Sequence, residues 1–263
     1  MTDFQKQFFS RLNIEEKEST SFEDLGKILH ATAQAIPFEN LDIIQSTVKE
    51  ISRENLQEKI LVHNRGGLCY ELNPTMYYFL KDCGFDVHLV SGTVYHAASG
   101  TWAVDSGHVA TVLKHNAELY LIEVGFGSNL PLSPVPFTGD IVHSVTGDYR
   151  IRKETTEKGN YILEMQKNNK FLDADSSQDW TLGYAFYIEA IDERKLNEAQ
   201  KTIVEHENSP FNKVPLIVKL TSDGHATLTK DRFTVTKQGK QNKEEITKEQ
   251  YSNLLHSTFG IQL

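Results

Sequence analysis

The chain has 263 residues, of which 39% are hydrophobic and 24% charged, and its formal net charge at pH 7 is -9; these values are typical of a globular protein and not of a disordered or fibrous one. The lack of a run of basic residues argues against a nucleic-acid partner. Because the sequence has neither a basic segment followed by an apolar one at its start nor about 18 consecutive apolar residues, we expect a cytoplasmic protein without a membrane partner.

Residues 1–86 predict a small bundle of helices. Apolar side chains at positions 4, 8, 9 and 12 recur at helical spacing. Ser21–Asp24 has the pattern of an N-terminal helix cap, and Ser52 can cap a second set of helices. A break at Ala35–Phe38 separates the two sets, and the second one ends with the apolar segment Met76–Gly84, whose glycine is a common helix stop.

Residues 87–191 predict short β-strands separated by clusters of Gly, Asn, Asp and Ser. Consecutive strands at such close spacing favour an antiparallel sheet or a small β-barrel. The expected strands are Val87–Tyr95, His108–Leu113, Leu119–Val124, Tyr161–Met165 and Tyr184–Ile188.

Residues 192–263 predict an α/β segment. It begins with a linking helix at Asp192–Glu205 and continues with the strands Val214–Leu220 and Ala226–Val235, which flank a turn. A capping box at Thr247–Gln250 predicts a last helix that extends to Phe259. The expected fold class is therefore α+β: a helical bundle (1–86), an antiparallel sheet or small barrel (87–191) and a C-terminal α/β segment (192–263).

Three residues offer the chemistry of an activated cysteine. Cys69 is preceded by two glycines, His108 follows it in the chain, and Glu123 follows His108. A thiol is mostly protonated at neutral pH, so a nucleophilic cysteine needs a histidine to take its proton and a third group to orient that histidine. The sequence therefore predicts an enzyme in which Cys69, His108 and Glu123 are the catalytic residues.

The register of one predicted hairpin decides whether two of these residues, His108 and Glu123, lie opposite each other. If the loop between His108–Leu113 and Leu119–Val124 is centred between His115 and Asn116, His108 lies directly opposite Glu123. Opposite residues of an antiparallel pair project from the same face with Cβ atoms about 5 Å apart, which allows a carboxylate to contact an imidazole. A slip by one residue places the two side chains on opposite faces.

Cys69 and Cys83 are expected to differ in reactivity. Cys69 lies just before a helical run, where a helix N-terminus favours the thiolate, although Asn73-Pro74 is itself a good helix start. Cys83 ends an apolar helix and is expected to be a buried, inert residue. We predict two free thiols, and the ten histidines lack a metal-ligand spacing, so no metal is indicated.

Three blocks of sequence resemble the arylamine N-acetyltransferases, namely Arg65-Gly66-Gly67-Leu68-Cys69-Tyr70-Glu71-Leu72-Asn73, Pro37-Phe38-Glu39-Asn40-Leu41 and Val124-Gly125-Phe126-Gly127. The resemblance extends over most of the chain and is looser in the last 70 or so residues. It implies a cysteine-protease-like core and a layout of N-terminal helical bundle, central antiparallel β-barrel and C-terminal α/β lid. It also implies a transferase that moves acetyl from acetyl-CoA through Cys69 to an arylamine, arylhydrazine or N-hydroxyarylamine by a ping-pong route.

The resemblance also implies roles for further residues. Phe38, Val94 and Phe126 would line the acceptor pocket, and the loop Gly125–Ser128, with Gly125, Gly127 and Ser128, would bind the CoA diphosphate through backbone amides. Arg65 would be structural, paired with Glu39. The chain departs from the family at Glu123, since the third residue is usually aspartate; we expect the longer side chain to fold back, or the local strand to shift, to keep contact with the imidazole.

Two alternatives remain open. A Cys-His-carboxylate site also suits a papain-like or transglutaminase-like hydrolase, because both reactions pass through a thioester. A relative that binds CoA but has lost turnover is the other alternative. Should the predicted register be wrong, His96 and His115 lie in the same β segment and are fallback bases.

Overall fold

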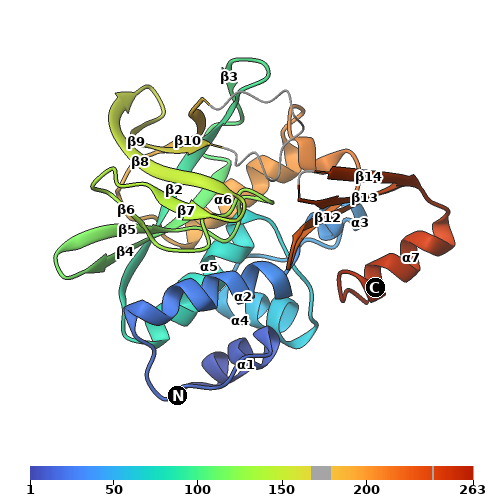
Figure 1. The fold of residues 1–263 in the computed structure, drawn as a ribbon, viewed down its shortest axis with the longest axis horizontal. Coiled ribbons are helices and arrows are strands. Elements are labelled where there is room, and N and C mark those ends of the chain that lie inside the picture. Colours follow the sequence, from blue (N-terminus) through green and yellow to red (C-terminus); the bar gives the residue numbers. More distant parts are fainter. Residues whose placement is uncertain (167–178, 239, 263) are drawn as a thin grey trace.

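The computed structural model describes residues 1–166, 179–238 and 240–262. In Figure 1 the N-terminal helices lie below a curved sheet, and a second sheet with the last helix lies beside them. The fold is α+β, and its larger sheet curves into a nearly closed, barrel-like form. Among the described residues, no helix is both long and apolar enough to cross a membrane.

The N-terminal helices form where the sequence predicts them. Ser52 accepts a hydrogen bond from Asn55 N and so caps α4, and α4 continues directly into a π-helical segment, η2. The helical elements of this part are α1 (Asp3–Leu12), η1 (Phe22–Asp24), α2 (Leu25–Ala35), α3 (Leu41–Gln45), α4 (Arg53–Leu56), η2 (Gln57–Val62) and α5 (Cys69–Asp82).

Helix α5 begins at Cys69 itself, not at the alternative start after Asn73, and it contains Pro74 in its second turn. Pro74 is the sixth residue of the helix, beyond the first N–H groups that lack a partner within it, so the proline removes one hydrogen bond of the helix. Gly84 ends this segment with a positive φ of 87°, as its position predicts. The helix packs against β2 and β4 and so connects the helical part to the larger sheet.

The larger sheet is antiparallel, with the order β6-β5-β4-β2-β10-β9-β8-β7, and β3 pairs with β2. Contacts between β6 and β8 bring its two ends together. The five expected strands are present, whereas β3, β6, β7 and β8 were not predicted. The strands are β2 (Asp86–His96), β3 (Thr101–Trp102), β4 (His108–His115), β5 (Glu118–Ile122), β6 (Val135–Pro136), β7 (Val142–Ser144), β8 (Gly147–Thr156), β9 (Gly159–Gln166) and β10 (Thr181–Phe186).

The hairpin register predicted for β4 and β5 is wrong. Thr111 pairs with Ile122 and His115 with Glu118, so the loop is centred between Asn116 and Ala117. Both of these residues have positive φ angles, 51° and 66°, which is the conformation of a type I′ turn. The pairing ends at Ile122. The observed register differs from the predicted one by two residues along β5, and because side chains alternate between the two faces of a sheet, a shift of two leaves the predicted face of each side chain unchanged.

The C-terminal sheet has the order β1-β11-β12-β13-β14. The predicted strand Ala226–Val235 is wrong, since a turn divides it into β12 and β13, and β14 was not predicted. The elements are β1 (Phe38–Glu39), β11 (Leu216–Thr221), β12 (Gly224–Thr229), β13 (Arg232–Lys237), β14 (Lys240–Glu245), α6 (Glu193–Glu205), η4 (Pro210–Asn212) and α7 (Lys248–Ser257). The capping box predicted at Thr247 is present at the start of α7.

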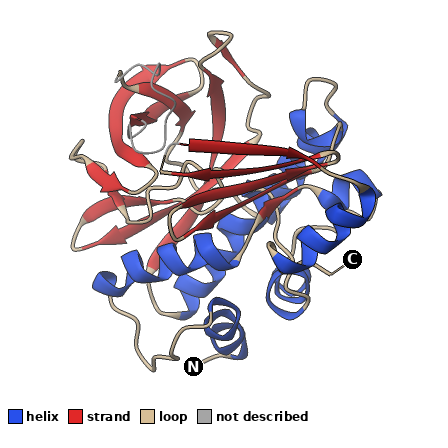
Figure 2. Ribbon diagram, turned by 45° about the vertical axis from the view of Figure 1, so that its right-hand side comes forward, coloured by secondary structure: helices blue, strands red, loops and turns tan. Residues whose placement is uncertain are grey.

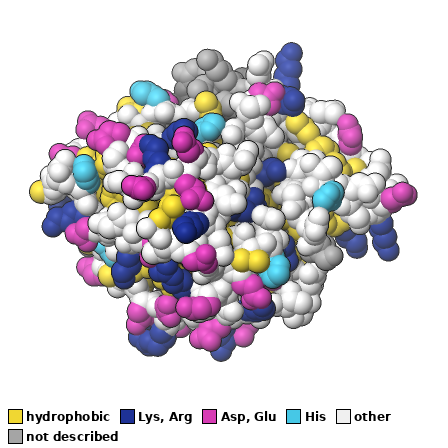
Figure 3. All heavy atoms as spheres, turned by 90° about the horizontal axis from the view of Figure 1, so that it is seen from below, with side chains coloured by type: hydrophobic (Ala, Val, Ile, Leu, Met, Phe, Trp, Pro, Cys, Tyr) yellow, Lys and Arg dark blue, Asp and Glu magenta, His cyan; other side chains and the backbone are white. Residues whose placement is uncertain are grey.

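Contacts between distant segments hold these parts together. Strand β1 comes from the N-terminal part, yet Phe38 pairs with Val218 of β11. Leu196 and Ile203 of α6 pack into the hydrophobic core formed by the N-terminal helices. Figure 2 shows helices on one side of the strands, and on the face seen in Figure 3 acidic and basic side chains are interspersed.

Candidate active site

Cys69 lies at the start of α5 and is 6% exposed. Its Sγ is 3.5 Å from the carbonyl oxygen of Gly107. The Glu71 carboxylate accepts a hydrogen bond from Leu68 N at 2.9 Å, which fixes the residue that precedes the cysteine. The thiol is therefore held at a helix N-terminus, where the helix dipole favours its negatively charged form.

His108 is the first residue of β4, and its Nε2 is 2.8 Å from Glu123 Oε2. Both side chains are almost completely buried. Because Nε2 contacts the carboxylate, Nδ1 is the nitrogen that remains to exchange a proton with Cys69. The structure thus brings together the three residues that the sequence singled out, although not through the predicted pairing.

Glu123 follows the end of β5, and its carboxylate accepts four hydrogen bonds. Oε2 accepts from His108 and from the hydroxyl of Tyr184 at 2.7 Å. Oε1 accepts from Asn73 Nδ2 at 2.8 Å and from the backbone N–H of Gly125 at 2.6 Å. Since Gly125 is only two residues further along the chain, the longer side chain folds back toward its own backbone, one of the two adjustments we expected.

The charges of the cluster change the pKa of each partner. Burial alone would lower the pKa of His108, but the Glu123 carboxylate and the Cys69 side chain outweigh it and raise this pKa to about 10. Burial would raise the pKa of Glu123, yet the imidazole and the hydrogen bonds from Asn73 and Tyr184 lower it. The favoured state of this pair is thus a protonated imidazole beside an ionised carboxylate.

Asn73 and Tyr184 are site residues that the sequence reasoning missed. The Asn73 amide donates to Glu123 and to Val109 O at 2.7 Å, and its oxygen accepts from Val124 N at 3.0 Å. Asn73 lies one helical turn after Cys69, a spacing that could have placed it on the same face of α5. No local pattern identifies Tyr184, because its partner Glu123 is 61 residues away in the chain.

A cavity of about 310 Å³ opens onto the thiol. Its walls are mostly apolar, and Cys69 and His108 line it. All six residues predicted to contact substrate or CoA line it as well, namely Phe38, Val94, Phe126, Gly125, Gly127 and Ser128. The ring centroid of Phe126 lies 5.4 Å from that of the His108 imidazole. An aromatic group that packs on Phe126 in this cavity would therefore lie beside His108.

Gly125 is required by a close approach of two segments. A Cβ atom at this position would lie 2.7 Å from both Cys69 Cα and Asn73 Nδ2, distances that real Cβ contacts do not reach. Gly127 has a positive φ of 63°, a conformation that glycine adopts without strain. The loop after Glu123 therefore packs directly against the start of α5.

The remaining candidates occupy different places in the fold. His96 lines the cavity, and His115 stacks on Phe22 with ring centroids 4.4 Å apart. Cys69 and Cys83 are free thiols, as predicted. Cys83 is half-buried, not fully buried as expected, and burial raises its pKa. Within the described parts of the chain, no group of three or more His, Cys, Asp or Glu side chains could hold a metal ion.

A family model described as N-acetyltransferase matches residues 21–263, and solved structures of arylamine N-acetyltransferases superimpose on the whole chain. The chain belongs to the arylamine N-acetyltransferase family. Its members are acyltransferases.

Three members show the range of similarity. A crystal structure of an arylamine N-acetyltransferase from Bacillus cereus, described as having a unique Cys-His-Glu catalytic triad, is 73% identical, with a TM-score of 0.95 and full coverage of both chains. The uncharacterized acetyltransferase YvcN of Bacillus subtilis is 39% identical over 91% of this chain and 90% of its own. The arylamine N-acetyltransferase of Mycobacterium marinum in complex with CoA is 23% identical, covers 98% and 92% of the two chains with a TM-score of 0.83, and shows the same fold.

In this N-acetyltransferase, a network of ion pairs stabilises the start of α5. Arg65 contacts the buried Glu39 carboxylate at 2.9 Å, as the family resemblance implied, and also Asp42 at 2.8 Å. Lys59 pairs with Asp42 at 2.8 Å and with Glu71 at 2.6 Å. Because Glu71 also binds the N–H that precedes Cys69, this network connects β1, η2 and the first turn of α5.

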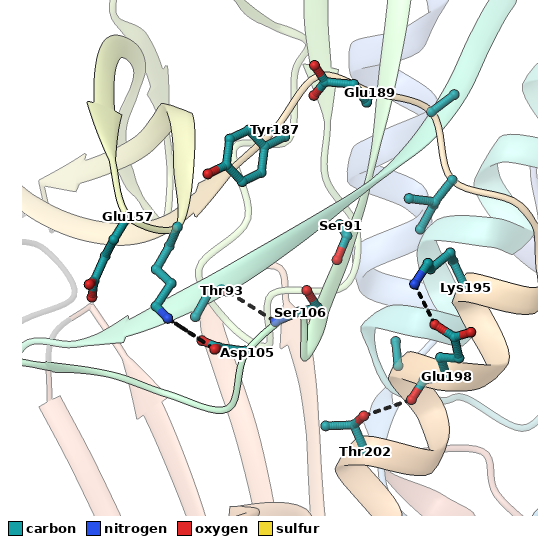
Figure 4. A pocket seen from close by; sticks show the side chains of 14 residues that line it. Ser91, Thr93, Asp105, Ser106, Glu157, Tyr187, Glu189, Lys195, Glu198 and Thr202 are labelled. Atoms are coloured by element: carbon teal, nitrogen blue, oxygen red, sulfur yellow. Dashed lines mark hydrogen bonds and ion pairs between the residues drawn. The ribbon is translucent and has the colours of Figure 1, made fainter.

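A larger cavity, of about 520 Å³, lies on the other face of β2. Ser91 and Thr93 line it, whereas Val94 and His96 line the Cys69 cavity, as expected for alternating side chains of a strand. Figure 4 shows two ion pairs at this cavity, Lys195 with Glu198 and Lys158 with Asp105. It shares no lining residue with the Cys69 cavity and so lies outside the N-acetyltransferase site.

Proposed function

We propose that this protein transfers an acetyl group from acetyl-CoA to the nitrogen of an arylamine, arylhydrazine or N-hydroxyarylamine through an acetyl-Cys69 thioester. The observation that carries the proposal is that Cys69 and His108 line one mostly apolar cavity, with His108 in contact with Glu123 at 2.8 Å. An activated thiol in the wall of a pocket of aromatic size suits acyl transfer to an aromatic amine.

In the first half of the reaction, the Cys69 thiolate attacks the carbonyl carbon of acetyl-CoA. The backbone N–H of Cys69, at the start of α5, is the natural donor to the oxyanion of the tetrahedral intermediate. When the C–S bond to CoA breaks, the protonated His108 gives its proton to the departing CoA thiolate. Glu123 stabilises the imidazolium before this step and orients the neutral ring after it.

In the second half, the acceptor nitrogen attacks the thioester carbonyl of acetyl-Cys69. His108, now neutral, takes the proton from the nitrogen, and the C–S bond to Cys69 breaks. The N-acetyl product leaves, and the thiolate and the imidazolium are restored together. One group thus acts as acid in the first half and as base in the second, for which a ring fixed by Glu123 is suited.

The walls of the cavity support the assignment of both substrates. Phe38, Val94 and Phe126 provide apolar surface for the aromatic ring. We assign the CoA diphosphate to the loop Gly125–Ser128, through backbone amides other than that of Gly125, whose N–H already donates to Glu123. We retain the division into a helical bundle (1–86), a β-barrel (87–191) and a C-terminal lid (192–263), with Cys69 on the first and His108 and Glu123 on the second.

The test is intact-protein mass spectrometry after the purified protein is mixed with acetyl-CoA. We expect a gain of about 42 Da, the mass of one acetyl group in place of a hydrogen, that is lost when an aromatic amine or hydrazine is added. Cys69→Ala abolishes the gain. Cys83→Ser is the matched control, because it removes the other free thiol and leaves acetylation intact.

Two other outcomes oppose the proposal. CoA binding without acetylation of Cys69 identifies a CoA-binding relative without turnover. An acetyl-enzyme that loses its acetyl group to water as fast as to the amine identifies a hydrolase.

A further inference from the structure

We propose that Asn40 is a positioning residue for the aromatic acceptor, in that its side-chain amide holds in place the wall of the Cys69 cavity that Phe211 and Leu216 form. The inference rests on the proposed function, which places the acceptor ring in this cavity but gives Asn40 no role.

One wall of the Cys69 cavity comes from the segment that follows α6. Phe211 lies in η4 and Leu216 begins β11, whereas residues 213–215 between them belong to neither element. The edge of the Phe211 ring meets the ring of Phe38, with centroids 5.6 Å apart. The shape of this wall therefore depends on how the connection between η4 and β11 is held. The residues of the segment that line the cavity are Asn208, Pro210, Phe211, Leu216 and Val218.

The Asn40 side chain binds this connection at both of its ends. Asn40 directly follows β1 and is almost completely buried. Its Nδ2 donates to Phe211 O at 2.7 Å and to Val214 O at 2.8 Å, and its Oδ1 accepts from Leu216 N at 2.7 Å. An asparagine amide carries two donor hydrogens and one acceptor oxygen. Both donors and the oxygen are thus used on one short stretch of backbone.

Loss of the amide should change what the cavity binds and not how the thiol reacts. Without Asn40, two carbonyl groups and one N–H group lose their partner. Buried polar groups without a partner are costly, so the connection would move toward water and take the wall with it. The hydrogen bonds of Cys69, His108 and Glu123 are made to other residues and stay in place.

The measurement compares two alkylating reagents, iodoacetamide and its N-phenyl derivative iodoacetanilide. With both, the Cys69 thiolate forms a C–S bond and iodide leaves, and the reagents differ only in one phenyl ring. The rate of each is followed on the Cys69 peptide by mass spectrometry. The ratio of the two rates reports how well the cavity binds an aromatic ring beside the thiol. It requires no acetyl-CoA, so it tests the wall even if the proposed acetyl transfer is wrong.

Asn197→Ala is the matched control for Asn40→Ala. Asn197 also makes three hydrogen bonds to backbone groups, those of Ile51 and Glu193, but neither Asn197 nor its two partners line the Cys69 cavity. In Asn40→Ala we expect the ratio of iodoacetanilide to iodoacetamide rates to fall about tenfold, with the iodoacetamide rate within about twofold of the unchanged protein. In Asn197→Ala we expect the ratio to stay within about twofold.

Two further variants show which contacts Asn40 acts through. Asn40→Asp keeps the size and the acceptor for Leu216 N, but it places a carboxylate oxygen against the carbonyls of Phe211 and Val214. We expect the same fall in the ratio as in Asn40→Ala, and thermal unfolding shows which variants fold. With Phe211→Ala already present, we expect Asn40→Asp to change the ratio less than about twofold, because two changes at one contact are not additive.

Several results overturn the proposal. These are an unchanged ratio in the Asn40 variants, an equal fall in Asn197→Ala, an equal loss of rate with both reagents, and an undiminished effect in the Phe211→Ala background. Failure of both Asn40 variants to fold also overturns it, because Asn40 is then a residue of the fold alone. With the expected ratios, a missing acetyl-enzyme overturns only the proposed function.

Discussion

Replacing Glu123 by glutamine tests the central electrostatic argument, because the change preserves size and removes charge. Each carboxylate oxygen accepts two hydrogen bonds, and all four partners are donors. A glutamine amide offers one accepting oxygen and one donating NH₂ group. In one orientation the NH₂ group faces the obligate donors Asn73 Nδ2 and Gly125 N. In the other it faces His108 and Tyr184, which accept only if the imidazole gives up its Nε2 proton and the hydroxyl turns its proton away. No rotation of the amide satisfies the site while the imidazole stays protonated.

The size of the effect follows from this mismatch. Two buried donors without an acceptor, at about 1–3 kcal/mol each, predict a loss of about 2–6 kcal/mol in the free energy of unfolding. Loss of the carboxylate in other catalytic triads lowers kcat about 10⁴-fold. For Glu123→Gln we expect acetylation of Cys69 to slow by about 10³–10⁴-fold, equivalent to about 4–5.5 kcal/mol in the activation free energy.

The assay is rapid-quench mass spectrometry of the acetyl-enzyme, with urea denaturation for stability. Glu164→Gln is the control, because Glu164 is also a buried carboxylate, but it pairs with Arg150 and Arg152 on the other side of the barrel-like sheet. We expect this control to lose stability and to keep its acetylation rate. An acetylation rate of Glu123→Gln within tenfold of the unchanged protein refutes the reasoning.

Three further changes have defined outcomes. The pKa of His108 is raised from its ordinary 6.5 to about 10, so its contribution to stability is complete below pH 6.5 and is lost as pH rises through about 10. Urea denaturation at pH 7 and at pH 10 should show a decline in the free energy of unfolding, and this decline should be smaller in the variant His108→Asn. Gly125→Ala forces a Cβ against Cys69 Cα and should slow acetylation by at least about tenfold with an unchanged circular dichroism spectrum; an unaltered rate contradicts the close approach. Arg65→Gln leaves a buried glutamate unpaired and should cost about 3–5 kcal/mol in urea denaturation, whereas the half-exposed Glu198, changed to Gln, should cost under about 1 kcal/mol.

Sequence reasoning succeeded where the signal is local. The hydrogen bonds that start α6 and α7, from Lys195 N to Asp192 and from Gln250 N to Thr247, join residues three apart. Such caps are visible in the sequence because donor and acceptor lie within one turn. The same holds for the glycine stop after α5. The family resemblance, in turn, named the residues that line the Cys69 cavity.

Reasoning from the sequence failed where tertiary contacts override local preference. Ala117 has a positive φ, which alanine rarely adopts, so the two-residue turn after β4 could not be recognised. The turn between β12 and β13 contains no glycine or proline, and β14 consists only of polar residues. Tyr184 meets Glu123 only in the assembled sheet, in which β10 pairs with β2 and β2 pairs with β4.

The pairing of β1 with β11 also has a consequence for synthesis on the ribosome. Asn40 accepts a hydrogen bond from Leu216 N at 2.7 Å, across 176 residues of chain, and Phe38 and Val218 line the Cys69 cavity together. At about 5–20 residues per second, the helix that carries the thiol is synthesised about 7–30 s before β11. The nascent chain thus carries an incomplete pocket for most of its synthesis, and chains released early lack the wall that would enclose an acceptor beside Cys69.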